Sequence, residues 1–363
     1  MRERILVAMS GGVDSSVAAA VLREAGFDVH GVTLQLWGKD VCVGSGTRLC
    51  CSVRDALDAR AVARRLGIRH ETLELVEAFR THVIDYFIEG YRRGLTPNPC
   101  IACNDHIKFG ALLEHAEALG VSLVATGHYA RSDYDAKRGR YTLMRAADPA
   151  KDQSYVLFNL TQGQLARARF PLGMMRKSEV RDLARSLGLA TAEKPDSQDV
   201  CFVRDRNKNG FLRQAVQESQ LPGPITDTDG NVLGTHAGLL GYTIGQREGL
   251  GVATGSPLYV VAIDQPKNRL VVGSRDDLLQ GELVAERVNW VSVPPPRQPL
   301  RAQAKIRSRH DAAQATLMPE QGDVVRVEFD EPQSAITPGQ AVVFYDEDLV
   351  LGGGWIERSV ISD

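Results

Sequence analysis

Short apolar runs alternate with amphipathic stretches through the first half of the chain. The apolar runs have the length of strands and lie at residues 4–9, 27–37, 70–75 and 121–125. The stretches with helical periodicity lie at residues 17–25, 53–66, 79–91, 107–119 and 177–187. Strands that are mostly apolar belong to a sheet that is covered on both faces. The pattern therefore predicts an α/β fold with a doubly wound parallel sheet.

The second half of the chain has a different texture. Beyond residue 205 the segments are short and rich in Gly and Pro, with strand-like runs at 258–263, 269–272 and 283–291. Three consecutive prolines at 294–296 indicate a linker or a strand edge. The runs at 302–309, 324–329 and 341–345 alternate as the strands of a small β-barrel do. We expect three domains, at residues 1–204, 205–285 and 286–363.

Composition narrows the class of protein. The chain has 363 residues, of which 43% are hydrophobic and 24% charged, and a formal net charge of −2. This charge excludes a generally basic nucleic-acid binder, so any polyanion must be held by local patches. No apolar run approaches the ~20 residues that span a bilayer. A glycine turn that begins at Ser10 leaves no room for a leader before it, so we expect a cytoplasmic protein without membrane attachment.

The first apolar run ends in the sequence SGGVDSS at residues 10–16. Paired glycines before a helix present backbone N–H groups and the positive end of the helix dipole, which suit a phosphate. Asp14 would repel a bare phosphate and is expected to hold a phosphate-bound Mg²⁺. A Walker A loop and a dinucleotide fingerprint both fit badly. The stretch therefore indicates a nucleotide site, the alternative being an ordinary turn between a strand and a helix.

All six cysteines lie in the first 201 residues, which is unlike the disulfide framework of a small secreted domain. Cys100 and Cys103 form a C-x-x-C pair, which is consistent with a redox disulfide, half of a zinc site or cluster ligands. With Cys201, they are expected in loops, where chemistry concentrates. A cysteine acts best as a thiolate, which needs a nearby positive charge or a helix N-terminus, and Cys103 is expected just before a helix. Cys42, Cys50 and Cys51 are as readily structural as functional.

Two further features suit a polyanionic ligand. Gly127 and His128 follow the strand at 121–125 and are expected at the carboxyl edge of the sheet, where ligands bind. A basic hairpin at 131–151 and a basic ridge of Lys305, Arg307 and Arg309, which on a strand would share one face, offer cations to a nucleic-acid backbone. The alternative for the ridge is a solvated barrel edge.

Several separated motifs together resemble the tRNA-specific 2-thiouridylase (MnmA) family of PP-loop ATP pyrophosphatases. The resemblance runs in order over nearly the whole chain. The motifs are SGGVDSS (10–16), TPNPCIACN (96–104), IKFG (107–110), ATGHY (125–129), KDQSY (151–155), PDSQ (195–198), CF (201–202) and TPGQ (337–340).

The resemblance implies an adenine nucleotide α-hydrolase-like fold and ATP-dependent 2-thiolation of the wobble uridine in tRNA anticodons. The 2-oxygen of uracil would be adenylated by ATP, with Mg²⁺, and then replaced by sulfur. By resemblance Cys201 carries the sulfur as a persulfide and Cys103 is the nucleophile, which leaves a disulfide between them. A persulfide donor protein and the anticodon stem-loop of tRNA would be the partners of a monomer.

The resemblance also assigns binding residues. Those expected to bind ATP are Ala8, Met9, Ser10, Gly11, Gly12, Val13, Asp14, Ser15, Leu34 and Gly127; for Leu34 the alternative is strand core. Those expected to contact tRNA or its target base are Asn98, Pro99, Cys100, His128, Lys151, Asp152, Gln153, Arg307, Ser308 and Gln340.

One position departs from the family. Cys100 stands where the family commonly has Asp, so an acid–base role at this position is not carried over. The substitution also allows an alternative in which Cys100, Cys103 and Cys201 hold an iron–sulfur cluster that carries sulfide. More remote alternatives are a PP-loop synthetase or amidotransferase and a non-catalytic tRNA-binding sulfur-relay protein.

Overall fold

The computed structural model describes residues 2–37, 53–196, 200–203, 207–216, 221–252 and 255–360. Cys42, Cys50, Cys51 and the expected loop at 38–51 lie outside these residues, as do Ser197 and Gln198 of the PDSQ motif. None of the described helices is long and apolar enough to cross a membrane.

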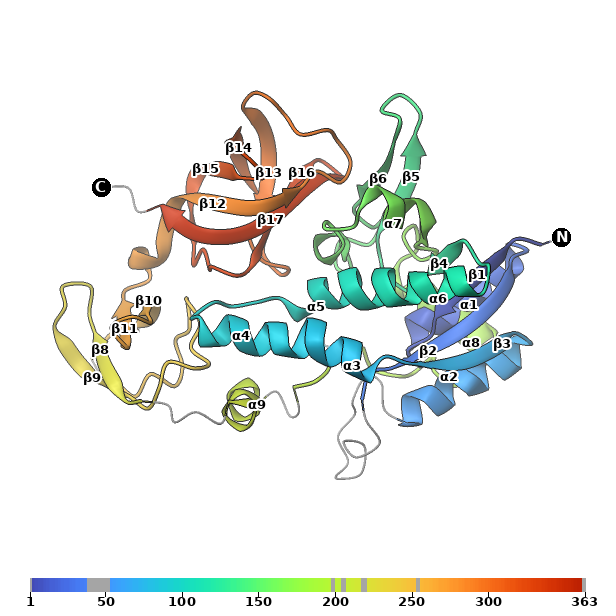
Figure 1. Cartoon of the computed structure of the whole chain (residues 1–363), viewed down its shortest axis with the longest axis horizontal. Coiled ribbons are helices and arrows are strands. Elements are labelled where there is room, and N and C mark those ends of the chain that lie inside the picture. The colour runs from blue at the N-terminus through green and yellow to red at the C-terminus, as the bar shows by residue number, and fades with distance from the viewer. Residues whose placement is uncertain are drawn as a thin grey trace.

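A five-stranded parallel sheet lies at the N-terminal side of the molecule (Figure 1). Its strand order is β3-β2-β1-β4-β7, with β1 at Arg4–Ala8, β2 at Asp28–Gln35, β3 at Arg69–Glu74, β4 at Leu123–Ala125 and β7 at Ala168–Arg169. Successive residues of β1 point to opposite faces, so Ile5 and Val7 join one hydrophobic cluster and Leu6 joins another. The predicted doubly wound parallel sheet is therefore confirmed.

Helices cover both faces of this sheet. One face packs against α1 (Val13–Glu24), α2 (Val53–Leu66) and α8 (Lys177–Ser186). The other face packs against two long helical rows. The first row is α3 (Val76–Phe79), a π-helical segment (Arg80–Asp85) and α4 (Tyr86–Arg92). The second is α5 (Pro99–Ala102), a π-helical segment (Cys103–Ala111) and α6 (Leu112–Ala118).

The second row corrects one expectation. The pattern predicts a helix from residue 107, but the helix begins at Pro99, whose fixed φ suits the first helical position and whose missing N–H costs nothing there. Asn98 caps this end by accepting a hydrogen bond from the Cys100 backbone N–H at 3.1 Å. Cys100 and Cys103 therefore lie inside a helix and not in the preceding loop.

A closed barrel forms the C-terminal unit, as predicted. Its strand order is β12-β15-β14-β13-β16-β17, and β12 pairs with β17 to close it. The strands are β12 (Leu279–Asn289), β13 (Leu300–Lys305), β14 (Ala313–Pro319), β15 (Val325–Ser334), β16 (Ala341–Asp346) and β17 (Leu349–Val360). The proline run at 294–296 connects β12 to β13 within the barrel. The expected boundary between residues 285 and 286 lies within β12.

The expected basic hairpin at 131–151 is present as β5 (Arg131–Asp135) and β6 (Arg140–Met144). It does not stand alone, because β6 pairs with β17 and extends the sheet of the barrel. Tyr155 also donates its hydroxyl to the Ala341 carbonyl at 2.8 Å. The N-terminal unit and the barrel are thus joined by strand pairing and by buried polar contacts.

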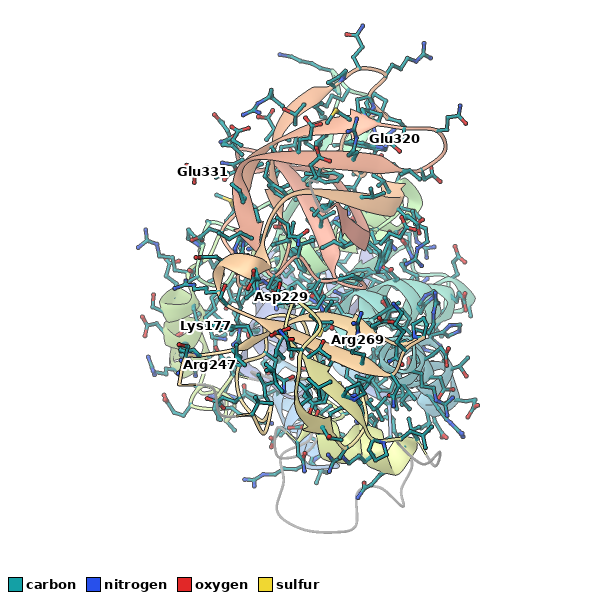
Figure 2. All side chains as sticks on the ribbon, turned by 90° about the vertical axis from the view of Figure 1, so that its left-hand side faces the viewer. Lys177, Asp229, Arg247, Arg269, Glu320 and Glu331 are labelled. Atoms are coloured by element: carbon teal, nitrogen blue, oxygen red, sulfur yellow. The ribbon has the colours of Figure 1, made fainter. Side chains whose placement is uncertain are left out.

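A small central unit lies between the two in the sequence and below the barrel in Figure 1. Its four-stranded sheet has the order β10-β11-β8-β9, from β8 (Gly223–Thr226), β9 (Val232–His236), β10 (Tyr259–Asp264) and β11 (Arg269–Gly273). Short helices α7 (Gln162–Arg167) and α9 (Lys208–Ala215) and the 3₁₀ turns Ser154–Val156 and Asp276–Leu278 complete the fold. In Figure 2 the labelled Glu320 and Glu331 lie on the barrel, and Asp229 and Arg269 lie on the central unit below it.

Candidate active site

A cavity of about 350 Å³ opens where the strand order of the parallel sheet reverses. Strands β1 and β4 are neighbours there, and ligands of doubly wound sheets bind outside the carboxyl ends of such strands. We call its two parts the phosphate side, which contains Ser10, Asp14, Ser15 and Gly127, and the sulfur side, which contains Cys103, Lys108, His128 and Cys201. The cavity is also lined by Ala8, Met9, Leu34, Leu36, Phe79, Val83, Pro99, Cys100, Thr126, Gln153, Val200 and Phe202.

The phosphate side is the turn between β1 and α1. Gly11 has φ +71°, and a Cβ there would collide with the Asp55 carbonyl. Ser15 accepts a hydrogen bond from the Ser10 backbone N–H at 3.1 Å and donates to the Gly12 carbonyl at 3.2 Å, which fixes the turn at the start of the helix. A Cβ on Gly127 would lie 2.8 Å from the Ser15 nitrogen. The absence of a side chain at Gly127 thus lets the end of β4 press against the helix start.

Asp14 belongs to a network of charges. Its two carboxylate oxygens each accept a hydrogen bond from Lys177 Nζ at 2.7 Å, and Oδ1 also accepts from the Tyr129 hydroxyl at 2.7 Å. Lys177 continues to Asp196 at 3.0 Å, and Asp196 accepts from Lys151 Nζ at 2.8 Å. Burial opposes ionisation of Asp196, but hydrogen bonds from Lys151 and Lys177 outweigh it and lower the pKa of the carboxyl to about 2. The network therefore holds alternating charges beside the phosphate side.

The segment that leads to Cys201 is tied to the same turn. Lys194 Nζ donates to the Gly11 carbonyl at 2.8 Å and lies 2.5 Å and 2.7 Å from carboxylate oxygens of Asp55 and Asp58. Cys201 itself is half-buried. The next residue, Phe202, packs its ring 5.1 Å from that of Phe87 and 6.1 Å from that of Phe79. These contacts anchor Cys201 at the cavity wall.

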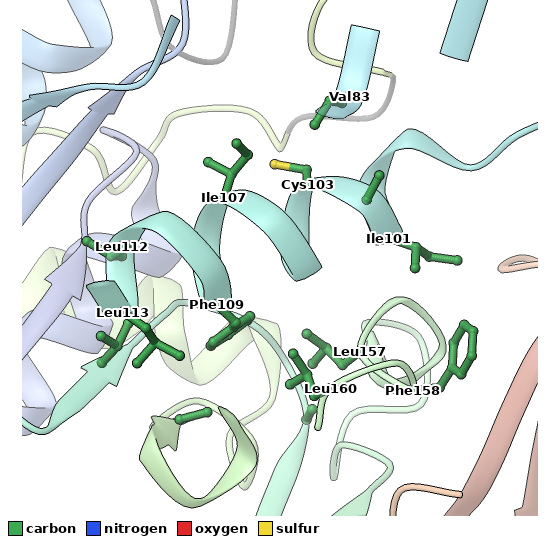
Figure 3. Close-up of a cluster of buried hydrophobic side chains, with 14 of the residues drawn as sticks. Val83, Ile101, Cys103, Ile107, Phe109, Leu112, Leu113, Leu157, Phe158 and Leu160 are labelled. Atoms are coloured by element: carbon green, nitrogen blue, oxygen red, sulfur yellow. The ribbon is translucent and has the colours of Figure 1, made fainter. Parts of the chain in front are cut away.

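Cys103 lies on the second helical row and faces the same cavity. In Figure 3 its sulfur points away from Phe109, Leu157 and Leu160, toward the side of the helix on which Val83 lies. Burial raises the pKa of the Cys103 thiol to about 11, although Lys108 acts in the opposite direction. The expected position just before a helix is wrong for Cys103, because the helix begins about a turn earlier, at Pro99.

His128 and Lys108 connect the two sides of the cavity. His128 is buried; its Nδ1 lies 2.7 Å from Thr126 Oγ1 and its Nε2 lies 3.3 Å from Lys108 Nζ. Because a lysine ammonium only donates, Nε2 accepts and Nδ1 donates to Thr126. Burial, and then the charge of Lys108, lower the pKa of His128 well below its usual value. His128 is therefore neutral, and Lys108 is additionally held by Asn104 Oδ1 at 3.0 Å.

The segment expected to contact the target base is fixed by the barrel. Gln340 donates its side-chain amide to the Thr96 carbonyl at 2.6 Å, and the Thr96 N–H donates to the Pro338 carbonyl at 2.9 Å. Asn98 caps the helix that follows, Pro99 is buried and Cys100 is exposed. Pro99 and Cys100 thus line the cavity, while Asn98 caps their helix and Gln340 holds the segment that precedes it through Thr96.

The other expected tRNA contacts have mixed environments. The carboxylate of Asp152 is 5% exposed and accepts hydrogen bonds from Ala146 N and Ser154 N at 3.0 Å and 3.1 Å. Gln153 lines the cavity and accepts from the Tyr129 N–H at 2.9 Å. Both side chains hold the fold together at these positions, whereas Lys151 is more open, with 37% of its side chain exposed.

The basic ridge differs from the expectation. Strand β13 ends at Lys305, so Arg307 and Arg309 lie in the turn that follows and do not alternate along one strand face. Arg307 is half-buried and donates to the Ser334 carbonyl at 3.2 Å, and Ser308 is exposed. The prediction is wrong because a local alternation of charges does not show where a strand ends.

The described side chains suit a nucleotide-bound Mg²⁺ better than an iron–sulfur cluster. No group of three or more His, Cys, Asp or Glu side chains within the described ranges is arranged to hold a metal ion. Cys100, Cys103 and Cys201 all line the cavity but form no such group, so the iron–sulfur alternative is not supported. A Mg²⁺ that arrives with nucleotide needs only one or two carboxylates from the protein, and Asp14 fits this requirement.

Sequence reasoning missed the groups that surround these residues. Lys177, Tyr129 and Asp196 form the charge network at Asp14. Lys108 is the one Lys or Arg among the described residues that line the cavity. Lys177 opens a helix 163 residues from Asp14, and no pattern in the sequence pairs them. Lys108 and Asp196 lie within the IKFG and PDSQ motifs, but a motif does not show which side chains its residues will contact.

Comparisons with known proteins agree over the whole chain. Residues 3–205 match a family model described as tRNA methyl transferase HUP domain. Residues 209–274 match a tRNA methyl transferase PRC-barrel domain and residues 280–356 an aminomethyltransferase beta-barrel domain. A solved 4-thiouridine synthetase–RNA complex with bound ATP shows 18% identity and a TM-score of 0.33, covering 59% of this chain and 50% of that chain. This score is too low to support the fold, which rests on the sheet topology.

Two curated relatives are far more similar. The tRNA-specific 2-thiouridylase MnmA 1 of Thermoanaerobacter sp. (strain X514) is 50% identical over 98% of this chain and 98% of its own length. The tRNA-specific 2-thiouridylase MnmA of Symbiobacterium thermophilum is 52% identical over 99% of this chain and 93% of its own length. The chain therefore belongs to the tRNA-specific 2-thiouridylase (MnmA) family.

Proposed function

We propose that this protein is an ATP-dependent tRNA-uridine 2-sulfurtransferase that thiolates the wobble uridine of tRNA anticodons. The observation that supports this proposal most directly is a single cavity lined both by the glycine turn, through Ser10 and Asp14, and by two cysteines from distant segments, Cys103 and Cys201. A nucleotide and a sulfur carrier would thus meet at one place. Membership of the tRNA-specific 2-thiouridylase family indicates that the substrate is tRNA.

The phosphate side suits the activation of the base by ATP. The carbonyl oxygen at C2 of uracil is a poor leaving group, so it must first attack the α-phosphate of ATP, with release of pyrophosphate. The backbone of the turn and the start of α1 would hold the phosphates, with Ala8 to Ser15, Leu34 and Gly127 around the nucleotide. Asp14 would hold Mg²⁺, which when bound supplies charge neutralisation at the phosphates. On nucleotide binding Lys177 would exchange its contact with Asp14 for one with a phosphate.

The sulfur side suits delivery from a persulfide. The terminal sulfur of a persulfide on Cys201 attacks C2, and AMP leaves with the original oxygen. The Cys103 thiolate then attacks Cys201 Sγ, which forms the Cys103–Cys201 disulfide and breaks the S–S bond, so that the electron pair stays on the sulfur at C2. A dithiol reductant regenerates the two thiols. Each step needs both cysteines at one cavity, and both line it.

The tRNA contacts are proposed around the cavity mouth. A flipped uridine would lie against Asn98, Pro99 and Cys100, beside Gln340. Lys151, Arg307 and Ser308 would contact the backbone near the anticodon, while His128, Asp152 and Gln153 would shape the pocket. A protein persulfide donor, a cytoplasmic location and a monomeric state complete the proposal. The three-domain division at 1–204, 205–285 and 286–363 remains part of it.

Each rival function leaves some of the groups that line the cavity without a role. The family-model descriptions name methyl transfer, and a synthetase or amidotransferase would share the glycine turn, but neither reaction uses a pair of cysteines. A non-catalytic sulfur relay would have no use for Asp14 and its charge network. The paired cysteines beside a phosphate turn therefore favour thiolation.

Single substitutions test the proposal. Cys103→Ser and Cys201→Ser should each abolish 2-thiouridine formation in tRNA, measured by mass spectrometry of digested nucleosides, and leave ATP binding intact. Asp229→Asn, on an exposed hairpin far from the cavity lining, is the control and should retain thiolation within a few-fold. Full thiolation by either of the first two variants would overturn the assignment.

A further inference from the structure

Cys103 presents a chemical problem that its surroundings must solve. A thiolate is the nucleophile in sulfur chemistry, and burial raises the pKa of this thiol to about 11 even though Lys108 acts in the opposite direction. A positive charge in the cavity wall is what opposes this rise. Within the described part of the chain, Lys108 is the one Lys or Arg side chain that lines the cavity.

The contacts of Lys108 leave its charge available. Its ammonium donates to Asn104 Oδ1 at 3.0 Å and to the neutral His128 Nε2 at 3.3 Å. A lysine has three N–H donors, so these two contacts leave one for a group in the cavity. Both partners are neutral, and among the described residues Lys108 makes no ion pair, in contrast to Lys151, Lys177 and Lys194. A half-buried cation without a counter-ion costs free energy unless a ligand or a reacting group supplies the compensating negative charge.

The backbone places Lys108 on the same face as Cys103. In an α-helix, with 3.6 residues per turn, residues five apart point about 140° away from each other. Cys103–Ala111 is π-helical, and Leu112 N–H donates to the Ile107 carbonyl five residues back. In such a segment the wider turn brings residues five apart onto the same side of the helix, and Cys103 and Lys108 both line the cavity. The wider turn thus brings Lys108 toward Cys103, and π-helical insertions of this kind are frequent at functional sites.

Neighbouring side chains hold this unusual turn. Gln164 donates to the Phe109 carbonyl at 2.7 Å and to the Asp105 carbonyl at 3.4 Å, and Asn104 of the segment itself donates to the Val156 carbonyl at 2.8 Å. At Gly110 a Cβ would lie 2.9 Å from the Asp105 carbonyl oxygen, which is backbone and cannot easily move aside. The π-helical geometry therefore depends on a glycine at 110 and on donors from the segments packed against it.

We propose that Lys108 is the positioning cation that stabilises the thiolate of Cys103, and that the π-helical segment Cys103–Ala111 serves to aim it there. The proposal rests on the proposed function for its purpose. The claim that the charge of Lys108 controls the reactivity of the Cys103 thiol does not depend on tRNA or ATP. His128 and Asn104 orient the ammonium, and their neutrality keeps its charge for Cys103.

The experiment measures alkylation of Cys103 by iodoacetamide in the full-length protein without ATP, tRNA or a sulfur donor. Peptide mass spectrometry resolves Cys103 from the other cysteines. An opposite charge close to a group shifts its pKa by about 1–3 units, so Lys108→Gln should slow alkylation roughly tenfold or more at each pH from 7 to 9. Lys108→Arg, which keeps the charge, should restore at least a third of the wild-type rate.

Two features of the experiment distinguish an effect of charge from a change in access to Cys103 and from a failure to fold. Glutamine is shorter than lysine and opens the cavity, so an effect of access alone would speed alkylation. Gly110→Ala should slow alkylation in the same direction by displacing Lys108, whereas Gly163→Ala should not, because a Cβ at Gly163 meets nothing within 4 Å. Circular dichroism and thermal melting identify any variant that fails to fold.

An unchanged Cys103 alkylation rate in folded Lys108→Gln would overturn the proposal. If ATP binding is weakened in the same variant, Lys108 is a phosphate ligand instead. Failure of thiolation in Cys103→Ser or Cys201→Ser is a separate readout, so loss of this inference leaves the proposed function standing, and the reverse also holds.

Discussion

The two sides of the cavity neutralise charge in different ways. On the phosphate side Asp14, Lys177, Asp196 and Lys151 alternate in sign and pair with one another at 2.7–3.0 Å. On the sulfur side Lys108 has neutral partners and Cys103 is a buried thiol. The phosphate side can thus exchange one set of ion pairs for another when nucleotide arrives. On the sulfur side the charge of Lys108 has no such pairing among the described residues.

The largest effect is expected from breaking the phosphate side. Asp14→Asn keeps an acceptor for Tyr129 but removes the charge that pairs with Lys177 and would hold Mg²⁺. Loss of one such electrostatic contribution typically costs about 10²–10³-fold in kcat, so thiolation should fall by at least 10²-fold. Asp229→Asn, on an exposed hairpin of the central unit, is the matched control and should be silent. An active Asp14→Asn would contradict this account of the phosphate side.

A smaller effect is expected on the sulfur side from Phe202→Ala. This ring is 4% exposed and contacts Trp37, Phe79, Phe87 and Phe211. Removing it should lower the free energy of unfolding by roughly 3–5 kcal/mol and should loosen Cys201. Thiolation should fall more than tenfold in protein that is still folded, while the Kd for ATP stays within about twofold.

Urea unfolding and ATP titration measure these two quantities. Tyr134→Ala, on the exposed hairpin, is the control. If Phe202→Ala weakens ATP binding as much as thiolation, the two sides of the cavity are not separable.

The dependence of stability on pH sharpens the contrast further. The folded-state pKa of His128 lies well below its usual value of 6.5, since the site is buried and Lys108 is near. Neutral His128 therefore contributes stability above pH 6.5, and this contribution is lost as the pH falls, because the unfolded chain takes up the proton first. His128→Asn should unfold with a shallower loss of stability between pH 6.5 and 5 than the wild type. If the urea midpoints of the two proteins fall equally between pH 6.5 and 5, His128 is not neutral in the folded protein.

The smallest effect is expected at the outer end of the charge network. Lys151 pairs with Asp196 while 37% of its side chain is exposed, and such pairs contribute about 0–1 kcal/mol to stability. Lys151→Gln should leave stability almost unchanged. It should weaken tRNA binding a few-fold and reduce the slope of log K against log salt by about one. Filter binding from 50 to 300 mM salt tests this, and an unchanged slope would remove Lys151 from the tRNA contacts.

The phosphate side was largely predictable from the sequence. Ser10, Gly11, Gly12 and Asp14 are adjacent in the chain, and a strand, a glycine turn and a helix give their geometry locally. Short apolar runs between amphipathic stretches likewise indicated the doubly wound sheet, and alternating apolar residues indicated the barrel. What local patterns cannot give is the partner of Asp14, because Lys177 reaches it only after the whole sheet has formed.

The sulfur side was predictable only in its cysteines. The apolar periodicity begins at residue 107, so it missed the turn from Pro99 that Asn98 caps and that buries Cys103. The π-helical segment depends on donors such as Gln164, which lies 55 residues from the Phe109 carbonyl. The basic ridge failed for a related reason, because the end of β13 at Lys305 is set by its pairing with neighbouring strands.

The central claim is that Cys103 and Cys201 act together at one cavity, and a single turnover without reductant tests it directly. Protein loaded with a persulfide on Cys201 is mixed with ATP, Mg²⁺ and tRNA, and disulfide-linked peptides are quantified by mass spectrometry. The account predicts one Cys103–Cys201 disulfide for each 2-thiouridine formed. Stoichiometric 2-thiouridine with both thiols still reduced, or with a disulfide to Cys100 instead, would contradict it.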